Sequence, residues 1–460
     1  MLAGALVVGL IADQSLRTGT FGLGAALTIA AAAAVLVFAG RLGTTEARVL
    51  AAGTVVFGAW LAVRASPWLL WPDLVASLAL LGMGASFSIR GSLLDLGIAE
   101  AAARTFHGML HMLSAAAFIP GPVLRTRSRL SAAAPIVRGV LIAAPIAAVL
   151  AALLAAADPV FASFFNLNLD FGQLTLDAIF VLAGTLFAAG LLRLASAEPM
   201  ERVDGPRWRL GAIEGLVVLV VLDVVFAAFA AAQAIAAAGA AGDTLRAAGI
   251  SYADYARSGF FQLLWVAGIT AVVIIVFSRI TSLSGDRARK SFTVLAEVGI
   301  GLTLLIVLVA FRRLSLYEEA FGFTMLRLYS HVFAAWIAAI FIFLGADIAG
   351  LGRGRRWFAG ATAASAAIVL LTLNLISPEA LVVGLNVDHA SATHKIDAAY
   401  LGGLSSDATP ALLGSTSRLE PSLRSQVIHA ACAGPRSYSA GPAAYNQADA
   451  DAAAARRSSC

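Results

Sequence analysis

Residues 311–345 read FRRLSLYEEAFGFTMLRLYSHVFAAWIAAIFIFLG, and this stretch decides the class of fold. Its first part gathers arginines, aromatic residues and a pair of carboxylates, and Gly322 separates it from a long apolar run. A helix needs roughly 20 apolar residues to cross the hydrocarbon core of a bilayer. The run from 323 to 345 therefore predicts a transmembrane helix with a polar, aromatic segment at its entrance.

The composition of the whole chain agrees with this prediction. Hydrophobic residues make up 60% of the 460 residues, charged residues only 13%, and the mean hydropathy is +0.86. Soluble domains are about half apolar and about a quarter charged, so the composition excludes a water-soluble particle. The net charge of +5 comes from arginines in short loops between apolar runs. That placement indicates membrane topology, and we expect the lipid bilayer as a partner and no nucleic acid.

Apolar runs long enough to span a bilayer recur along most of the chain. They lie at 21–39, 47–63, 68–89, 135–157, 173–195, 211–239, 260–278, 292–311, 323–345 and 357–376, and a shorter one lies at 2–12. The predicted fold is all-α, a polytopic transmembrane helical bundle of about eleven spans, with a range of 10–12. The predicted transmembrane domain covers residues 1–377.

The charges of the loops predict which side each loop faces. Basic residues fill the segments 125–138, 193–209, 279–290 and 353–356, and cytoplasmic loops of membrane proteins carry such an excess. Residues 97–122 are expected to form a helix lying in the membrane interface rather than a span. This pattern predicts a bacterial inner-membrane protein with its N-terminus in the cytoplasm and its C-terminus outside.

The tail from residue 378 to 460 contains no further span and is rich in Ala, Ser, Gly and Asp. We expect it to be ordered at most to about residue 413 and flexible beyond. The two cysteines of the chain, Cys432 and Cys460, both lie there. An outward tail would allow a disulfide between them, although two unrelated thiols are favoured.

Ionisable groups inside spans are the first place to look for function, because an unpaired charge in the bilayer is costly. Asp223 lies near the middle of the run 211–239 with apolar residues on either side. It predicts either a proton or cation relay or a carboxyl group that hydrogen-bonds to a neighbouring helix. Asn374, in the last span, is expected to act only as an interhelical hydrogen-bond partner.

Polar residues also gather in the loops expected outside. The structural interpretation is that these residues form an interfacial belt without a specific ligand, since Tyr and Trp favour the headgroup level of a membrane. The functional interpretation is that the loops form a single outward-facing site that binds an anionic headgroup or a glycan. Its candidate residues are Asp158, Tyr252, Asp254, Tyr255, Arg257, Tyr317, Glu318, Glu319, Arg327 and Tyr329.

Within this site, Arg327 and Gly322 carry specific expectations. Arg327 stands one turn into its span and needs a counter-charge, for which Glu318, Glu319 or Asp254 are candidates. Gly322 is expected to form the turn between an interfacial helix and the span that begins at 323.

Nucleotide-binding and catalytic motifs are not found in the sequence. It contains no G-x-x-x-x-G-K-[ST], no G-x-G-x-x-G between a strand and a helix, and no G-x-S-x-G. His107 and His111 have an i,i+4 spacing that could bind a metal, but no carboxylate or Cys partner is identifiable, so two interfacial histidines are favoured, and neither cysteine belongs to a CxxC or a His/Cys cluster. We therefore expect no metal and no cofactor.

Four patches of sequence resemble a known family. They are ADPVF at 157–161, SYADYARSGFF at 251–261, RLSLYEEAFGFTMLRLY at 313–329, and a patch at 386–412 that contains LSSDA at 404–408 and PAL at 410–412. In this order they resemble the uncharacterised bacterial multi-pass inner-membrane family catalogued as a domain of unknown function (the 4153/4173 type). The resemblance implies a membrane-embedded helical bundle and carries no established activity.

The leading functional hypothesis is a non-enzymatic accessory, scaffold or sensor component of an envelope system. The first alternative is a proton-coupled transporter or permease that uses Asp223. The second is a membrane enzyme that acts on lipid or glycan through Asp158, Asp254 or Glu318. The proposed outward site belongs to the leading hypothesis and to the membrane-enzyme alternative.

Overall fold

A computed structural model describes most of the chain as helices. It describes residues 2–40, 42–88, 92, 95–113, 171–197, 209–235, 260–352, 356–436 and 441–460. Within these ranges there is no strand, only one isolated bridge between Leu210 and Thr281. The prediction of an all-α helical membrane bundle is confirmed.

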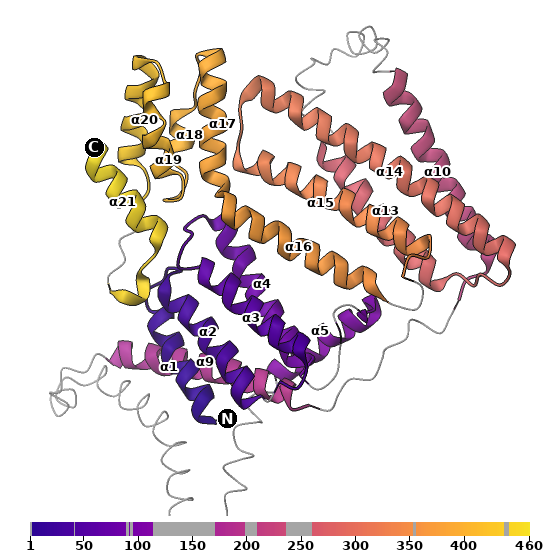
Figure 1. Ribbon diagram of the computed structural model, residues 1–460, viewed down its shortest axis with the longest axis horizontal. Helices are drawn as coiled ribbons and strands as arrows, with labels where there is room; N and C mark the ends of the chain where they lie inside the picture. Colours follow the sequence, from indigo (N-terminus) through magenta and orange to yellow (C-terminus); the bar gives the residue numbers. More distant parts are fainter. Residues whose placement is uncertain are drawn as a thin grey trace, which may run out of the picture.

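The first bundle contains the helices of the N-terminal half (indigo to magenta in Figure 1). Its members are α1 (Leu2–Leu16), α2 (Leu23–Ala39), α3 (Thr45–Trp60), α4 (Pro67–Ser86), α5 (Ile98–Leu113) and α9 (Phe171–Ala195). Small residues such as Ala32, Ala51 and Ala188 are almost fully buried in its core. They let the helix backbones approach closely, which is how helices pack in a bilayer.

The second bundle lies beside the first and contains longer helices. Its members are α10 (Ala212–Ile235), α13 (Phe260–Ile280), α14 (Asp286–Phe321), α15 (Met325–Ile348) and α16 (Trp357–Ile376). Larger side chains, among them Ile274, Phe292 and Phe341, fill its core. Helix α16 contacts both α15 and α4, so it forms the seam between the two bundles (Figure 1).

Seven of the described helices are long and apolar enough to cross a membrane: α4, most of α9, α10, α13, most of α14, α15 and α16. Helices α1 and α2 are apolar but shorter. The predicted run at 135–157 lies outside the described residues. Of the segment 97–122, the structure describes α5, which is too short to be counted among these spans, and its interfacial position stays a prediction.

Helix α14 corrects one expectation from the sequence. We expected residues before Gly322 to form a separate interfacial helix, but α14 runs without a break through all 36 residues from Asp286 to Phe321. At 1.5 Å per residue it is about 54 Å long, well beyond a hydrocarbon core of about 30 Å. The polar aromatic segment is therefore the end of a spanning helix that projects past the bilayer.

Gly322 does form the expected turn. Its φ of 77° lies in the left-handed region, and its N–H donates to the carbonyl of Glu318, which ends α14. A Cβ at this position would stand 2.7 Å from Oδ1 of Asn386, which itself bonds the backbone of Phe323. Only glycine fits this combination of backbone and neighbour.

The C-terminal residues form a helical cap over one end of the bundles (gold and yellow in Figure 1). We use "the cap" for residues 378–460, whose helices are α17 (Pro378–Thr393), α18 (Ala398–Gly402), α19 (Thr409–Gly414), α20 (Pro421–Ala433) and α21 (Gln447–Ser459). Its core includes Val382, Leu401, Leu412 and Val427, all almost fully buried.

The order of the cap extends beyond the point that the sequence suggested. Helices α20 and α21 follow residue 413, and Cys432 at the end of α20 forms a disulfide with Cys460. The disulfide corrects our expectation that Cys432 and Cys460 would be two unrelated free thiols. The faces of these helices are lined by alanines such as Ala431 and Ala452, which bury little area each but fit closely, so hydropathy does not reveal them.

The ends of the helices fall into two groups. At the cap end, the loop between α3 and α4 contacts the cap through backbone hydrogen bonds such as Gln447 N–H to Ala62 C=O. The start of α15 contacts the cap through the N–H of Met325, which donates to the hydroxyl of Tyr400. At the opposite end, which we call the basic end, Gly43 bonds Ser88, and Leu210 bonds Ile280. Arg48, Arg193, Arg209, Arg279, Arg287, Arg289, Lys290 and Arg356 all belong to helix ends or loops on that side.

Candidate functional site

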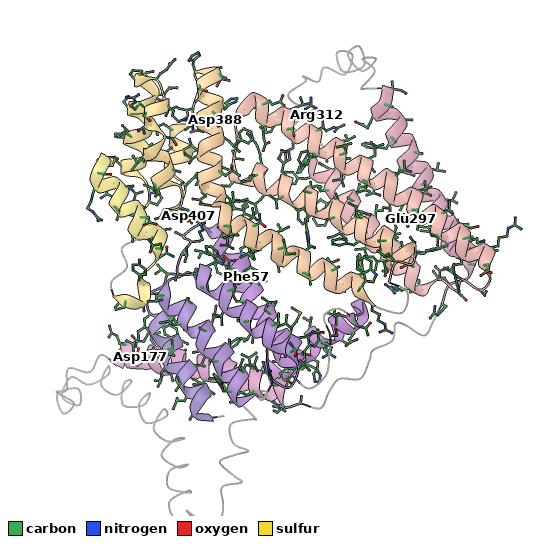
Figure 2. All side chains as sticks on the ribbon, in the orientation of Figure 1. Phe57, Asp177, Glu297, Arg312, Asp388 and Asp407 are labelled. Carbon is green, nitrogen blue, oxygen red and sulfur yellow. A yellow bond between two sulfur atoms is a disulfide. The ribbon has the colours of Figure 1, made fainter. Side chains whose placement is uncertain are left out.

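The most extensive polar cluster lies where the cap meets the bundles (Figure 2). We call it the cap junction and define it by Arg64, Ser66, Glu379, Ser405 and Asp407. The arginine and first serine come from the loop between α3 and α4, Glu379 from the first turn of α17, and the last two from the loop between α18 and α19. The two loop residues are separated from the three cap residues by more than 300 positions in sequence.

Asp407 binds the loop between α3 and α4 with both of its carboxylate oxygens. Oδ2 accepts the backbone N–H groups of Ala65 and Ser66, each at 2.7 Å. Oδ1 lies 3.3 Å from Nη1 of Arg64, a pair in which the side chain of Asp407 is only 2% exposed. Charge-assisted hydrogen bonds of this kind are about twice as strong as neutral ones.

Glu379 completes the cap junction with three more hydrogen bonds. Its Oε1 accepts the hydroxyl of Ser66 at 2.6 Å, and its Oε2 accepts the N–H and the hydroxyl of Ser405 at 2.9 and 2.7 Å. Burial raises the pKa of this carboxyl group, whereas the bonds from Ser66 and Ser405 lower it. Both carboxylates of the junction are thus occupied by donors of the protein itself.

A second polar pair lies below the junction, inside the seam between α4 and α16. Asn374 donates from Nδ2 to Oδ1 of Asp73 at 2.8 Å, and neither residue has measurable exposure. Arg64 donates through Nε and Nη2 to the backbone carbonyl of Asn374, with Nε at 3.0 Å. The cap junction and the Asp73–Asn374 pair are therefore connected through one guanidinium group.

A proline in α4 explains a third contact between helices. Pro72 lies inside α4 and has no N–H, so the carbonyl of Trp68 lacks its intrahelical donor. The hydroxyl of Tyr329, on α15, donates to that carbonyl at 2.9 Å, and the Trp68 and Tyr329 rings lie 5.0 Å apart. Tyr329 thus joins the second bundle to the first.

Residues 51–414 match the model of a family described as Domain of unknown function (DUF4153). The chain belongs to this family. No curated protein and no solved structure matches it. The matched region of this DUF4153 protein contains every residue of the cap junction and the Asp73–Asn374 pair. It ends before α20, α21 and the disulfide.

Half of the outward site predicted from sequence lies outside the described residues: Asp158, Tyr252, Asp254, Tyr255 and Arg257. Whether they join the other half stays a prediction. The described half consists of Tyr317, Glu318 and Glu319 on α14 and Arg327 and Tyr329 on α15.

Arg327 contacts an aromatic ring and the end of a helix. Its guanidinium carbon lies 4.3 Å from the centre of the Tyr317 ring, and Nη1 donates to the carbonyl of Gly322. Glu318 instead faces His331, with Oε1 and Nδ1 3.3 Å apart, and Glu319 lies 3.9 Å from Arg312. Neither glutamate pairs with Arg327, which instead contacts the Tyr317 ring face and the negative C-terminal end of α14. The third candidate counter-charge, Asp254, lies outside the described residues.

Tyr329 does not share this cluster, because its hydroxyl bonds Trp68 on the other side of α15. The described half of the predicted site is thus divided. Tyr317 and Arg327 lie together, Glu318 is buried against His331, and Tyr329 belongs to the seam with α4.

Asp223 is buried in the second bundle, as its sequence position suggested. Neither carboxylate oxygen has a hydrogen-bond partner among the described residues. Oδ1 stands 2.8 Å from the place that a Cβ on Gly299 of α14 would take, and Cδ1 of Ile274 of α13 lies 3.8 Å from that same place. Its surroundings are apolar, so it lacks the ligand set of a metal site.

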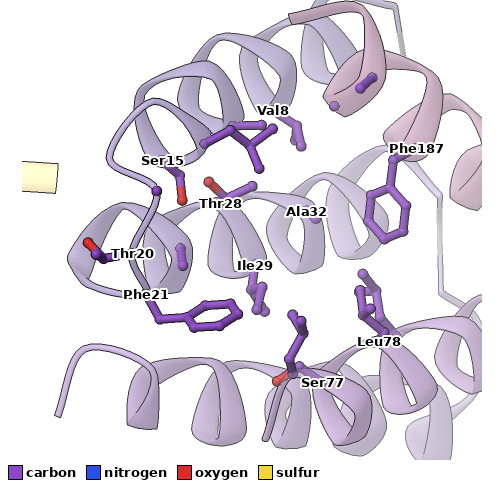
Figure 3. A pocket seen from close by; sticks show the side chains of 18 residues that line it. Val8, Ser15, Thr20, Phe21, Thr28, Ile29, Ala32, Ser77, Leu78 and Phe187 are labelled. Atoms are coloured by element: carbon purple, nitrogen blue, oxygen red, sulfur yellow. The ribbon is translucent and has the colours of Figure 1, made fainter. Parts of the chain in front are cut away.

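A cavity in the first bundle has little polar chemistry. It measures about 510 Å³ and lies between α1, α2, α4 and α9, lined mostly by apolar side chains such as Val8, Ile29 and Phe187 (Figure 3). Within the described residues, no group of three His, Cys, Asp or Glu side chains is placed to hold a metal ion.

Several site residues were missed from the sequence. Asp73 met the criterion that selected Asp223, an ionisable residue inside a predicted span, and would have been found by applying it throughout. Glu379 directly follows the last predicted span, where a carboxylate is unremarkable. Arg64 and Ser66 lie in a short loop of the N-terminal third and carry no local signal, because their partners are distant in sequence.

Proposed function

We propose that this DUF4153 protein is a non-catalytic inner-membrane component whose cap is a rigid docking platform on the extracytoplasmic face. The observation that carries the proposal is the saturation of Glu379 and Asp407 by Ser66, Ser405, Arg64 and backbone donors. An acid or base in catalysis must exchange its proton with a substrate within hydrogen-bond reach. Carboxylates that are fully occupied by the protein instead fix the cap to the bundles.

Two features support this orientation. Among the described residues of the two bundles, the basic end carries eight Arg and Lys residues, against the five arginines at the cap end, Arg17, Arg64, Arg312, Arg313 and Arg327. An excess of Lys and Arg in helix ends and short loops marks the cytoplasmic side. The cap at the opposite end contains the Cys432–Cys460 disulfide, which persists in oxidising compartments outside the cytoplasm. Both features favour a cytoplasmic N-terminus, since α1 leads from the basic end to the cap end.

The proposed ligand of the platform is an anionic headgroup or a glycan, the same class that the sequence suggested. Arg312 is exposed at the projecting end of α14, and its contact with Glu319 at 3.9 Å is loose. Such an exposed pair contributes little stability and exchanges readily with an anionic ligand.

The test is complementation of a deletion strain, scored as envelope-stress sensitivity, with protein levels measured in the membrane. A platform requires the cap junction, so Asp407→Ala should fail, because removing one partner of a buried pair costs about 3–5 kcal/mol. The matched control is Asp388→Ala, which removes a pair with Arg418 whose side chains are 60% and 55% exposed; it should complement. Glu318→Gln should also complement, and its failure at a normal membrane level would indicate catalysis instead.

A second candidate function rests on Asp223. A carboxyl group buried in the bundle with both oxygens unpartnered among the described residues favours proton-coupled transport. Under the platform proposal, Asp223→Asn complements fully. Under transport, the same variant assembles normally but fails, together with loss of proton-dependent uptake into vesicles.

A further inference from the structure

The Asp73–Asn374 pair contains two oxygens that have no hydrogen-bond donor among the described residues. Asn374 Nδ2 donates to Asp73 Oδ1 at 2.8 Å, so the two planar groups face each other across the seam. The remaining side-chain oxygens, Oδ2 of Asp73 and Oδ1 of Asn374, are buried and have no hydrogen-bond partner within the described part of the chain. A buried acceptor without a donor costs about 1–3 kcal/mol, and more when it is charged.

A single proton would satisfy both oxygens. An ionised carboxylate and an amide oxygen are both acceptors, so neither can serve the other. A protonated Asp73 carries an O–H on Oδ2, which donates to Oδ1 of Asn374. The two groups then form a closed ring with one hydrogen bond in each direction.

The charged groups around the pair do not replace this proton. Arg64 is the nearest cation, and its guanidinium is bound to the backbone carbonyl of Asn374 and to Asp407. The other titratable groups on this side are Tyr329, Glu379 and Asp407, none of which brings positive charge. On α1 and α9, Arg17 pairs with Asp13 and Asp177.

We propose that Asp73 is a proton-binding site, which holds one proton in a cyclic acid–amide pair with Asn374 and so joins α4 to α16. Loss of the proton places a carboxylate against the amide oxygen in a buried seam. Proton occupancy is therefore linked to the packing of the two bundles. This site is independent of the platform function, which needs only the cap junction.

Infrared spectroscopy of the purified full-length protein in lipid nanodiscs tests the site. We expect the wild type at pH 7 to show the C=O stretch of a protonated carboxyl group, and Asp73→Asn to lose it. Asn374→Leu should keep the band and shift it to higher frequency, because the hydrogen bonds are removed. Asp223→Asn is the matched control, since it removes another buried carboxyl group whose oxygens have no hydrogen-bond partner among the described residues, and it must leave the Asp73 band in place.

Thermal unfolding across pH gives a second readout. The protonated form is favoured only in the folded protein, so the melting temperature of the wild type should fall from acid to alkaline pH. Asp73→Asn is a permanently neutral mimic and should lack this pH-dependent fall in melting temperature.

If Asp73→Asn does not assemble, the shift of the carboxyl band in Asn374→Leu decides whether Asp73 is protonated. Identical spectra of wild type and Asp73→Asn would overturn the proposal, as would a melting temperature that rises with sodium concentration only when Asp73 is present.

Discussion

Among single residues, Pro72 shows how a local defect becomes a contact between bundles. The proline removes one donor from α4, and Tyr329 of α15 supplies the missing donor to Trp68. A residue that weakens its own helix thereby specifies which neighbour packs beside it. The sequence contains both residues, but their pairing across 261 positions depends on how the helices are arranged.

A double-mutant cycle tests this relation. Tyr329→Phe should destabilise the protein by about 0.5–1.5 kcal/mol, the net contribution of a typical intramolecular hydrogen bond, because it leaves the carbonyl of Trp68 without its donor. In a Pro72→Ala background the restored N–H bonds that carbonyl, so the same change should cost almost nothing. Chemical denaturation in detergent measures both costs; equal costs in the two backgrounds would show that the hydroxyl has another role.

Arg327 and Asp73 show how much of a residue's role can be predicted from the sequence alone. Arg327 was expected to need a counter-charge, and its contacts among the described residues include a ring and a carbonyl, groups that carry no charge that a sequence displays. Asp73 was visible as a carboxylate inside a span. Its meaning required Asn374 beside it, which the sequence identified only as a hydrogen-bonding residue without a partner.

Among the helices, α14 organises the second bundle, since α10, α13 and α15 all pack on it. The positions of these helices were predictable because each apolar run has the length of a span. The unbroken length of α14 was not, because the arginines at 312–313 and glutamates at 318–319 suggested a boundary. Charged residues do not interrupt a helix that projects into water, and Gly322 is the first residue that does.

Two glycines of α14 provide a matched test of its packing. Gly299→Ala should destabilise the protein by about 1–3 kcal/mol, since the new methyl group would stand 2.8 Å from Oδ1 of Asp223 and overpack the contact with α10. Gly301→Ala, where no atom lies within 4 Å, should be neutral or stabilising by up to about 1 kcal/mol. Denaturation midpoints compare the two, and equal effects would contradict the close approach of α10 and α14.

For the whole molecule, the cap is the feature that sequence reasoning described least well. Its helices are short and rich in alanine, and its attachment depends on Asp407 and Glu379 reaching a loop more than 300 residues earlier. The patch LSSDA at 404–408 was singled out, yet a pattern cannot show what it binds. The membrane bundle follows from local composition, whereas the cap follows from contacts between distant segments.

A docking platform on the extracytoplasmic face requires the cap to lie outside the cytoplasm, and the two cysteines of the chain report on this directly. The measurement is labelling of intact spheroplasts with a membrane-impermeant maleimide, before and after treatment with an impermeant reductant. A variant with Arg289→Cys serves as the control at the basic end and should label only after permeabilisation. We expect Cys432 and Cys460 to be labelled in intact spheroplasts, and only after reduction of their disulfide. Labelling of these cysteines only in permeabilised cells, without any need for reductant, would contradict it.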